Sequence, residues 1–162
     1  MVLLMKIHWM IKDEIIAIAK KHQVTGYSKY NKKDLIPYVI DFILKEEQMK
    51  RYFKFMHDSE IEALEDAYIP SEQDDEYEYL YNGGYCGMNG EFGIVIPDEV
   101  VRAYKKIDTK AFHKTRKRLS LIGRYLNAAN NLYAITPTKI LIDMFNQYEK
   151  EELKEEELLA LI

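Results

Sequence analysis

The chain has 162 residues, of which 48% are apolar and 31% are charged, and its formal net charge is −4 at pH 7. This composition predicts a folded protein with a packed core and no membrane span, since no apolar run approaches the roughly 20 residues that a transmembrane helix needs. The single cysteine, Cys86, excludes an internal disulfide and a cysteine-ligated zinc cluster. Lys6 and His8 interrupt the apolar N-terminal segment, which argues against a signal peptide, and we expect a cytoplasmic protein.

The first 57 residues are predicted to be helical. Residues 13–21 place isoleucines on one helical face, with acidic residues at the start, where the helix dipole favours them. A turn follows, and a second helix begins near Lys32 with Pro37 in its first turn. Residues 46–57 are expected to continue this helix after a kink. We expect residues 1–57 to form one domain and residues 58–162 a second.

The second domain is predicted to open with another helix. Ser59 and Glu62 have the spacing of a capping box, and the helix that they start is expected to stop at Pro70. An exposed acidic loop follows at residues 71–76. Tyrosines then alternate with polar residues over 77–81, a pattern that fits either a strand or one helical turn.

A β-hairpin is predicted after these tyrosines. Asn82-Gly83 and Asn89-Gly90 are both dipeptides typical of hairpin turns, which require positive φ at their central residues. We expect strands at Tyr85–Met88 and Phe92–Ile96, with positive φ at Gly90.

Helices are predicted over the rest of the chain. One begins at Pro97-Asp98 and ends near Ile107, and a longer one covers 110–134. Thr136-Pro137 is typical of a helix start, and the helix that follows is expected to run through Ile140, Leu141, Met144, Phe145 and Tyr148. An acidic helix ends the chain. The predicted fold class is mainly α, with an N-terminal helical module, a helix–β-hairpin–helix region similar to a winged helix, and C-terminal helices.

Charge is segregated along the chain. Residues 58–100 carry thirteen carboxylates and no lysine or arginine, whereas residues 101–127 carry nine basic residues and one acidic residue. Like charges must be separated or matched when the chain compacts. Either the acidic segment packs beside the basic one within the molecule, or one of the two faces a partner.

The segment 13–44 resembles a known family. It contains a short helix with Ile18-Ala19, then GYSK at 26–29, then the charged helix start KKDLI at 32–36, and it is similar to the SAP-like module at the N-terminus of Rho transcription termination factors. In Rho an RNA-binding OB-type barrel follows, but no run of five strands is predicted here. The whole chain is also similar to uncharacterised proteins of low-GC Gram-positive bacteria and their phages, which pair such a module with a helix–hairpin–helix region. Some of these carry a cysteine-rich metal-binding tail that this sequence lacks, so no metal or cofactor is implied.

The start of the second helix is one candidate phosphate site. Its unpaired backbone N–H groups and the helix dipole favour an anion, and Lys29, Lys32 and Lys33 flank it. Tyr27 and Tyr30 are candidates for stacking on bases. Alternatively, the tyrosines fill a small core and the lysines only solvate the surface.

The long helix 110–134 holds the second candidate. It opens with HKTRKR at 113–118, and a polar stripe runs along it on the face opposite its leucines. Such a stripe can bind phosphates in a groove, although a solvated face or docking on the acidic segment explains it equally well. The candidate nucleic-acid-binding residues of both sites are Lys29, Tyr30, Lys32, Lys33, Lys114, Arg116, Lys117 and Arg124.

The sequence gives little support for catalysis. The glycine-rich segment 83–90 lacks the lysine and serine or threonine of a phosphate-binding loop, and no histidine motif accompanies Cys86. The acidic charge of 58–100 argues against DNA reading by that segment. We therefore expect a non-enzymatic protein that binds DNA or RNA, with the lysines of 29–33 dominant. The alternative is a protein–protein adaptor or inhibitor, of phage origin, whose acidic surface binds a basic protein.

Overall fold

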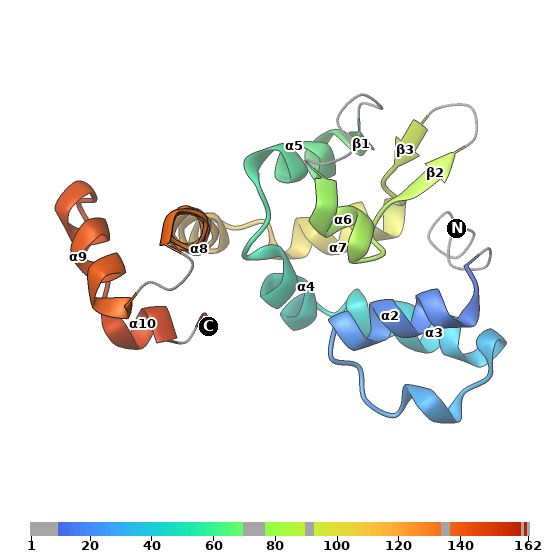
Figure 1. The fold of residues 1–162 in the computed structure, drawn as a ribbon. Helices are drawn as coiled ribbons and strands as arrows, with labels where there is room; N and C mark the ends of the chain where they lie inside the picture. The colour runs from blue at the N-terminus through green and yellow to red at the C-terminus, as the bar shows by residue number, and fades with distance from the viewer. Residues whose placement is uncertain (1–9, 70–76, 90–92, 134–136, 160, 162) are drawn as a thin grey trace.

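The computed structural model describes residues 10–69, 77–89, 93–133, 137–159 and 161, and it is mainly helical (Figure 1). The elements in chain order are α2 (Lys12–Lys21), the 3₁₀ helix η1 (Tyr27–Lys29), α3 (Lys32–Ile43), α4 (Glu46–Phe53), α5 (Asp58–Asp66), β1 (Tyr68–Ile69), α6 (Glu78–Asn82), β2 (Gly87–Asn89), β3 (Gly93–Val95), α7 (Asp98–Ile107), α8 (Lys110–Tyr133), α9 (Thr138–Tyr148) and α10 (Glu155–Leu159).

The first helices follow the predicted pattern closely. Glu14 reaches back to accept the backbone N–H of Ile11 at 2.8 Å, which starts α2, and Ile15 and Ile18 are buried on its inner face. Asn31 caps α3 by accepting the N–H of Asp34 at 3.1 Å. Pro37 lies in the second turn of α3 rather than the first.

The predicted kink after α3 is a complete break. Lys45 has extended backbone angles, with φ −66° and ψ 136°, so α4 begins as a separate helix at Glu46. This break turns the chain back, and α4 packs beside α7 as well as α3.

Glu60, not Glu62, closes the start of α5. One oxygen of its carboxylate accepts the N–H of His57 at 3.2 Å, and the other accepts the N–H of Leu80 at 3.0 Å. Burial raises the pKa of Glu60, and these N–H donors oppose the increase. The buried carboxylate therefore both caps α5 and fixes α6 beside it.

The predicted helix–β-hairpin–helix, winged-helix-like region is wrong. The β structure among the described residues is limited to three strands of two or three residues, in the order β1-β3-β2 and antiparallel throughout. The outer strand β1 lies where the helix from Ser59 was expected to end, and the alternating tyrosines of 77–81 form α6 instead of a strand. The strand β1 is set by its pairing with β3, which lies far along the chain, and the local pattern does not record that pairing.

The two asparagine–glycine pairs have different outcomes. Asn82-Gly83 ends α6, with Gly83 in the right-handed region and Gly84 at φ 78°, so it makes no hairpin turn. An added Cβ at Gly84 would also lie 2.9 Å from Cδ1 of Ile18, so that side chain would have to shift. The predicted turn at Gly90 lies outside the described residues, as do the expected acidic loop 71–76 and the expected start of a helix at Thr136.

One large core joins the helices α2–α7. Its centre is an aromatic cluster in which Tyr85 packs edge-on to Phe53, with ring centroids 4.7 Å apart. The Tyr85 hydroxyl donates to the carbonyl of Ile43 at 2.9 Å. His22 is fully buried beside the Tyr52 ring, and its Nε2 donates to the carbonyl of Gly83 at 2.9 Å. This core contains residues from both sides of residue 57. The division of the chain into two domains at that residue stays a prediction.

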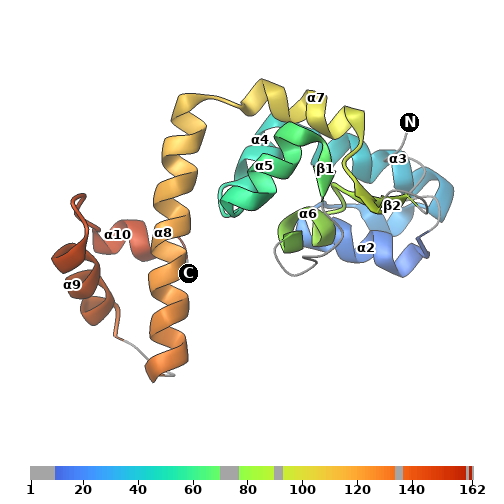
Figure 2. The same cartoon turned by 90° about the horizontal axis from the view of Figure 1, so that it is seen from above.

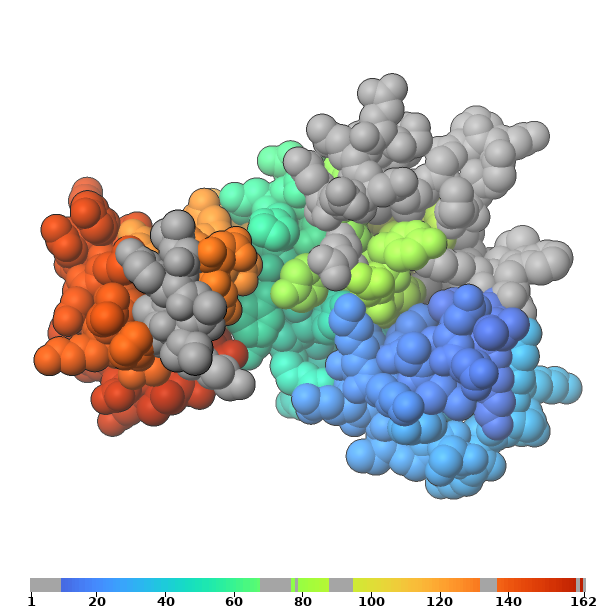
Figure 3. All heavy atoms as spheres, in the orientation of Figure 1, coloured from blue at the N-terminus to red at the C-terminus, as the bar shows by residue number. Residues whose placement is uncertain are grey.

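A second, smaller core lies between α8, α9 and α10, around Ile122, Phe145 and Leu158. Figure 2 shows that α8 turns sharply away from α7 and carries α9 and α10 along its length. The space-filling view places this part at one end of the molecule and α2 and α3 at the other, with α4 and α5 between them (Figure 3). The helices within the described ranges are all too short or too polar to cross a bilayer.

The buried histidine predicts a pH dependence of stability. Desolvation lowers the pKa of His22 from 6.5 to about 4. Between these two pH values the imidazole binds a proton in the unfolded chain but not in the folded one. The contribution of neutral His22 to the free energy of unfolding is therefore fully present above pH 6.5. It falls as the pH drops from 6.5 towards 4, by about 3 kcal/mol. Urea unfolding at pH 7, 6, 5 and 4 measures this. In His22→Gln, which keeps a donor for Gly83, the loss over this range should be smaller by that amount, and an identical loss would contradict the assignment.

Candidate nucleic-acid interface

The lysines expected to bind phosphate at the start of α3 are exposed. Lys29 lies in η1 and places its Nζ 5.2 Å from the centre of the Tyr30 ring. Lys32 and Lys33 form the first two residues of α3 and are exposed. Asn31 Nδ2 donates to the carboxylate of Asp34 at 2.6 Å, so this helix start already holds one anionic group. The lysines remain suitable for phosphate contacts, but Asp34 competes with a phosphate for the helix end.

The tyrosines of the same module are not open for stacking. Tyr27 and Tyr30 are half-buried and pack against the large core. The Tyr30 ring lies 4.6 Å from the ring of Tyr38, and the Tyr38 hydroxyl donates to the carbonyl of Thr25. These contacts agree with the alternative that the tyrosines fill a core rather than stack on bases.

The basic stretch that opens α8 divides between two sides of the helix. Lys114, Lys117 and Arg124 are exposed, as the predicted polar stripe requires. Arg116, in contrast, is 2% exposed. Its Nη1 donates to the carbonyl of Met56 at 2.8 Å and its Nη2 pairs with Asp58, so the prediction that Arg116 contacts a ligand is corrected to a structural role.

The pair formed by Arg116 and Asp58 joins the basic segment to the acidic one within the molecule. The hydrogen bond from Arg116 lowers the pKa of Asp58, and the charges of Lys117 and Arg124 contribute to the same decrease. At this contact the acidic segment 58–100 therefore packs against the basic segment 101–127 within the molecule. The other carboxylates on the outer face of α5, Glu62, Glu65 and Asp66, are exposed.

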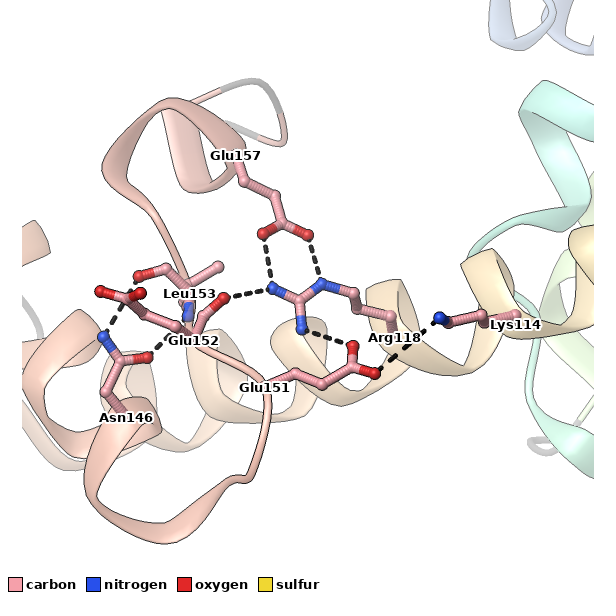
Figure 4. Close-up of polar contacts among 7 residues, drawn as sticks. All are labelled: Lys114, Arg118, Asn146, Glu151, Glu152, Leu153 and Glu157. Atoms are coloured by element: carbon pink, nitrogen blue, oxygen red, sulfur yellow. Dashed lines mark hydrogen bonds and ion pairs between the residues drawn. The ribbon is translucent and has the colours of Figure 1, made fainter.

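Arg118 holds the C-terminal segment against α8 (Figure 4). Its Nε and Nη2 donate to the two carboxylate oxygens of Glu157, each at 2.6 Å, and Nη2 also donates to the carbonyl of Glu152 at 2.7 Å. Glu151 accepts from Nη1 at 3.3 Å. The hydrogen bonds from Arg118 lower the pKa of Glu157. Asn146 stabilises the same loop by bonding both the N–H and the carbonyl of Leu153.

A cleft of about 460 Å³ lies beside Arg118, between α8 and the C-terminal end of α9. Lys114 and Lys117 line it from α8, and Tyr148 and Lys150 line it from the other side. Tyr148 is 70% exposed, so its ring is open to solvent. The sequence offered one sign of this, because the tyrosine is the last apolar residue before the charged run EKEE.

The cleft carries an excess of positive charge. Its lining includes the carboxylates of Glu149 and Glu151 beside four basic side chains. Glu149 accepts a hydrogen bond from the Tyr125 hydroxyl at 3.0 Å, and Glu151 lies 4.0 Å from Lys114 and closer to Arg118. Arg118 is held by its carboxylate partners, so the cations that face a ligand are the exposed Lys114, Lys117 and Lys150, of which Lys114 also lies near Glu151. Cations around an exposed aromatic ring suit an anion that carries a planar group.

The comparisons with known proteins gave no match. The chain is similar to none of the family models, curated proteins or solved structures compared with it. Within the described ranges, no three histidine, cysteine or acidic side chains lie close enough together to share a metal ion.

The structural role of Arg116 is tested by replacement with alanine. Arg116→Ala should lower the free energy of unfolding by about 2 kcal/mol or more, because it leaves the buried carbonyl of Met56 unsatisfied and removes packed side-chain atoms. Arg124→Ala removes the same charge from an exposed position on the same helix and should change stability by less than about 0.5 kcal/mol. Urea unfolding at pH 7 compares the two, and equal stabilities would contradict the role assigned to Arg116.

Proposed function

We propose that this protein binds nucleic acid without catalysing a reaction, and that the cleft between α8 and α9 is its main contact. The observation that carries the proposal is an exposed aromatic ring, Tyr148, beside the cations Lys114, Lys117 and Lys150. Lysines bind backbone phosphates, and a tyrosine face stacks on a base of any sequence. This combination favours single-stranded nucleic acid bound with little sequence preference.

The N-terminal module is proposed as a second contact. Lys29, Lys32 and Lys33 are exposed around the start of α3, and the resemblance of this segment to the Rho module is consistent with RNA or DNA as the ligand. Because Tyr30 is half-buried, we assign this surface to phosphate contacts and the stacking to Tyr148.

The second candidate function is that of a protein–protein adaptor. The exposed carboxylates of α5 favour it, since Glu62, Glu65 and Asp66 present negative charge on one short helix. A basic partner surface would pair with these residues. Binding of that kind depends on charges that the cleft variants below do not change.

The proposal predicts that cleft variants weaken binding to a single-stranded oligonucleotide. Lys114→Ala/Lys117→Ala should lower the affinity and flatten the slope of log K against log salt concentration by about 0.7 for each phosphate group that the variant no longer neutralises. Tyr148→Ala should lower the affinity with no change in that slope, because stacking releases no counterions; the expected cost is about 1–3 kcal/mol. Fluorescence anisotropy over a range of salt concentrations measures both quantities.

Two further variants complete this test. Lys12→Ala/Lys20→Ala removes two exposed lysines of α2 and should bind as the parent does. Reversing Lys29, Lys32 and Lys33 to glutamate changes the net charge by six and should weaken binding more than the cleft alanines do. If the parent shows no salt-sensitive binding to DNA or RNA, the nucleic-acid proposal fails and the adaptor takes its place.

A further inference from the structure

A second hollow, of about 480 Å³, lies where α4 meets the start of α8. It borders the cleft in sequence, since Thr115 stands between Lys114 and Lys117 on α8, but the two share no lining residue. Its lining contains three basic side chains, two threonines and no carboxylate: Lys50, Arg51, Lys54, Thr109, Ala111, Phe112 and Thr115. In a chain whose net charge is −4, a pocket lined by cations without a matching anion is unusual.

Arg51 is fixed in this pocket, and no described carboxylate forms an ion pair with it. Its Nη1 donates to Oε1 of Gln23 at 2.5 Å, and its Nη2 donates to the carbonyl of His22 at 2.6 Å. Both acceptors are neutral. These bonds hold the guanidinium in place and leave its positive charge uncompensated, which a charge-assisted hydrogen bond to an anion would relieve.

The two lysines and the threonines complete the lining. Lys50 is exposed, and the Nζ of Lys54 lies 4.8 Å from the centre of the Phe55 ring, a contact that keeps its charge. Thr109 Oγ1 accepts the N–H of Phe112 at 3.2 Å, so its hydroxyl hydrogen can still be donated. The nearby carboxylate of Asp108 is bonded to Nε2 of His113 at 2.6 Å and does not line the pocket.

We propose that this pocket binds the phosphate group of a small ligand. Lysine and arginine with hydroxyl donors are the groups that bind phosphate oxygens, and the volume falls within the range of about 300–1,000 Å³ that small-molecule sites occupy. The one aromatic side chain of the lining, Phe112, is 8% exposed, so the pocket offers no open ring for a base. The phosphate, rather than the group attached to it, is therefore what the pocket recognises. The pocket shares no lining residue with the nucleic-acid cleft.

The test measures the binding of inorganic pyrophosphate by isothermal titration calorimetry to the full chain. The parent should bind at a single saturable site, and Lys50→Ala/Lys54→Ala should bind about tenfold more weakly or worse, since the variant lacks two charge-assisted hydrogen-bond donors. Lys12→Ala/Lys20→Ala carries the same change in net charge on the surface of α2 and should bind as the parent does. Circular dichroism establishes that both variants are folded. Arg51 is left unchanged because it also bonds His22 and Gln23.

Three results would overturn the proposal. The first is the absence of saturable pyrophosphate binding by the parent, and the second is equal weakening in the two lysine pairs, which would show that only net charge matters. The third is displacement of bound pyrophosphate by a single-stranded oligonucleotide without a terminal phosphate. That result would assign the pocket to the backbone of nucleic acid rather than to a small ligand. Retained pyrophosphate binding in Lys114→Ala/Lys117→Ala separates this site from the cleft.

Discussion

The polar junction around His22 fixes the position of the basic pocket that α4 lines. The imidazole ties the end of α2 to Gly83, and the carbonyl of the same residue holds Arg51 of α4. Tyr85 adds a third bond by donating to Ile43. Because buried polar groups are costly without partners, these bonds allow little freedom in how α2, α4 and α6 pack. The face of α4 that carries Lys50 and Lys54 is set by this packing, and so is the position of α7, which packs on α4 and leads into α8.

The helix α8 connects the two halves of the molecule through two arginines with different tasks. Arg116 anchors its first turns to Met56 and Asp58, and Arg118 anchors the C-terminal segment to its other side. Arg116 is buried and Arg118 is paired with carboxylates, so neither guanidinium is presented to a ligand. What remains exposed are the lysines between and beyond them, and the cleft gains its accessible positive charge from Lys114 and Lys117. The architecture therefore separates the basic residues that hold the fold from those that face solvent.

Most helices were predictable because their signals are local. The acidic start and apolar face of α2, the asparagine before α3 and the Pro97-Asp98 start of α7 all act within a few residues of the chain. The exceptions have two causes. The cap by Glu60 is local, but it follows His57, which is not a typical N-cap residue. The bond from Leu80 to Glu60 and the pairing of β1 with β3 join residues far apart in the chain. The alternating tyrosines of 77–81 fit a strand or a helical turn locally, and the bond from Leu80 to Glu60 together with packing in the core favours the helix.

By itself, the sequence determined a mainly helical chain with segregated charge, and it indicated lysines near residues 29–33 and 114–117 as surface groups, because periodicity and charge are properties of neighbouring residues. Tertiary structure decided the rest. In the run HKTRKR, Arg116, Lys117 and Arg118 are chemically similar, yet one lies under α5, one is exposed and one binds Glu157. Tyr148 became an open ring, and residues 50–54 met residues 109–115 in one pocket. Burial and charge pairing depend on what the fold brings from elsewhere in the chain, and no local pattern contains that information.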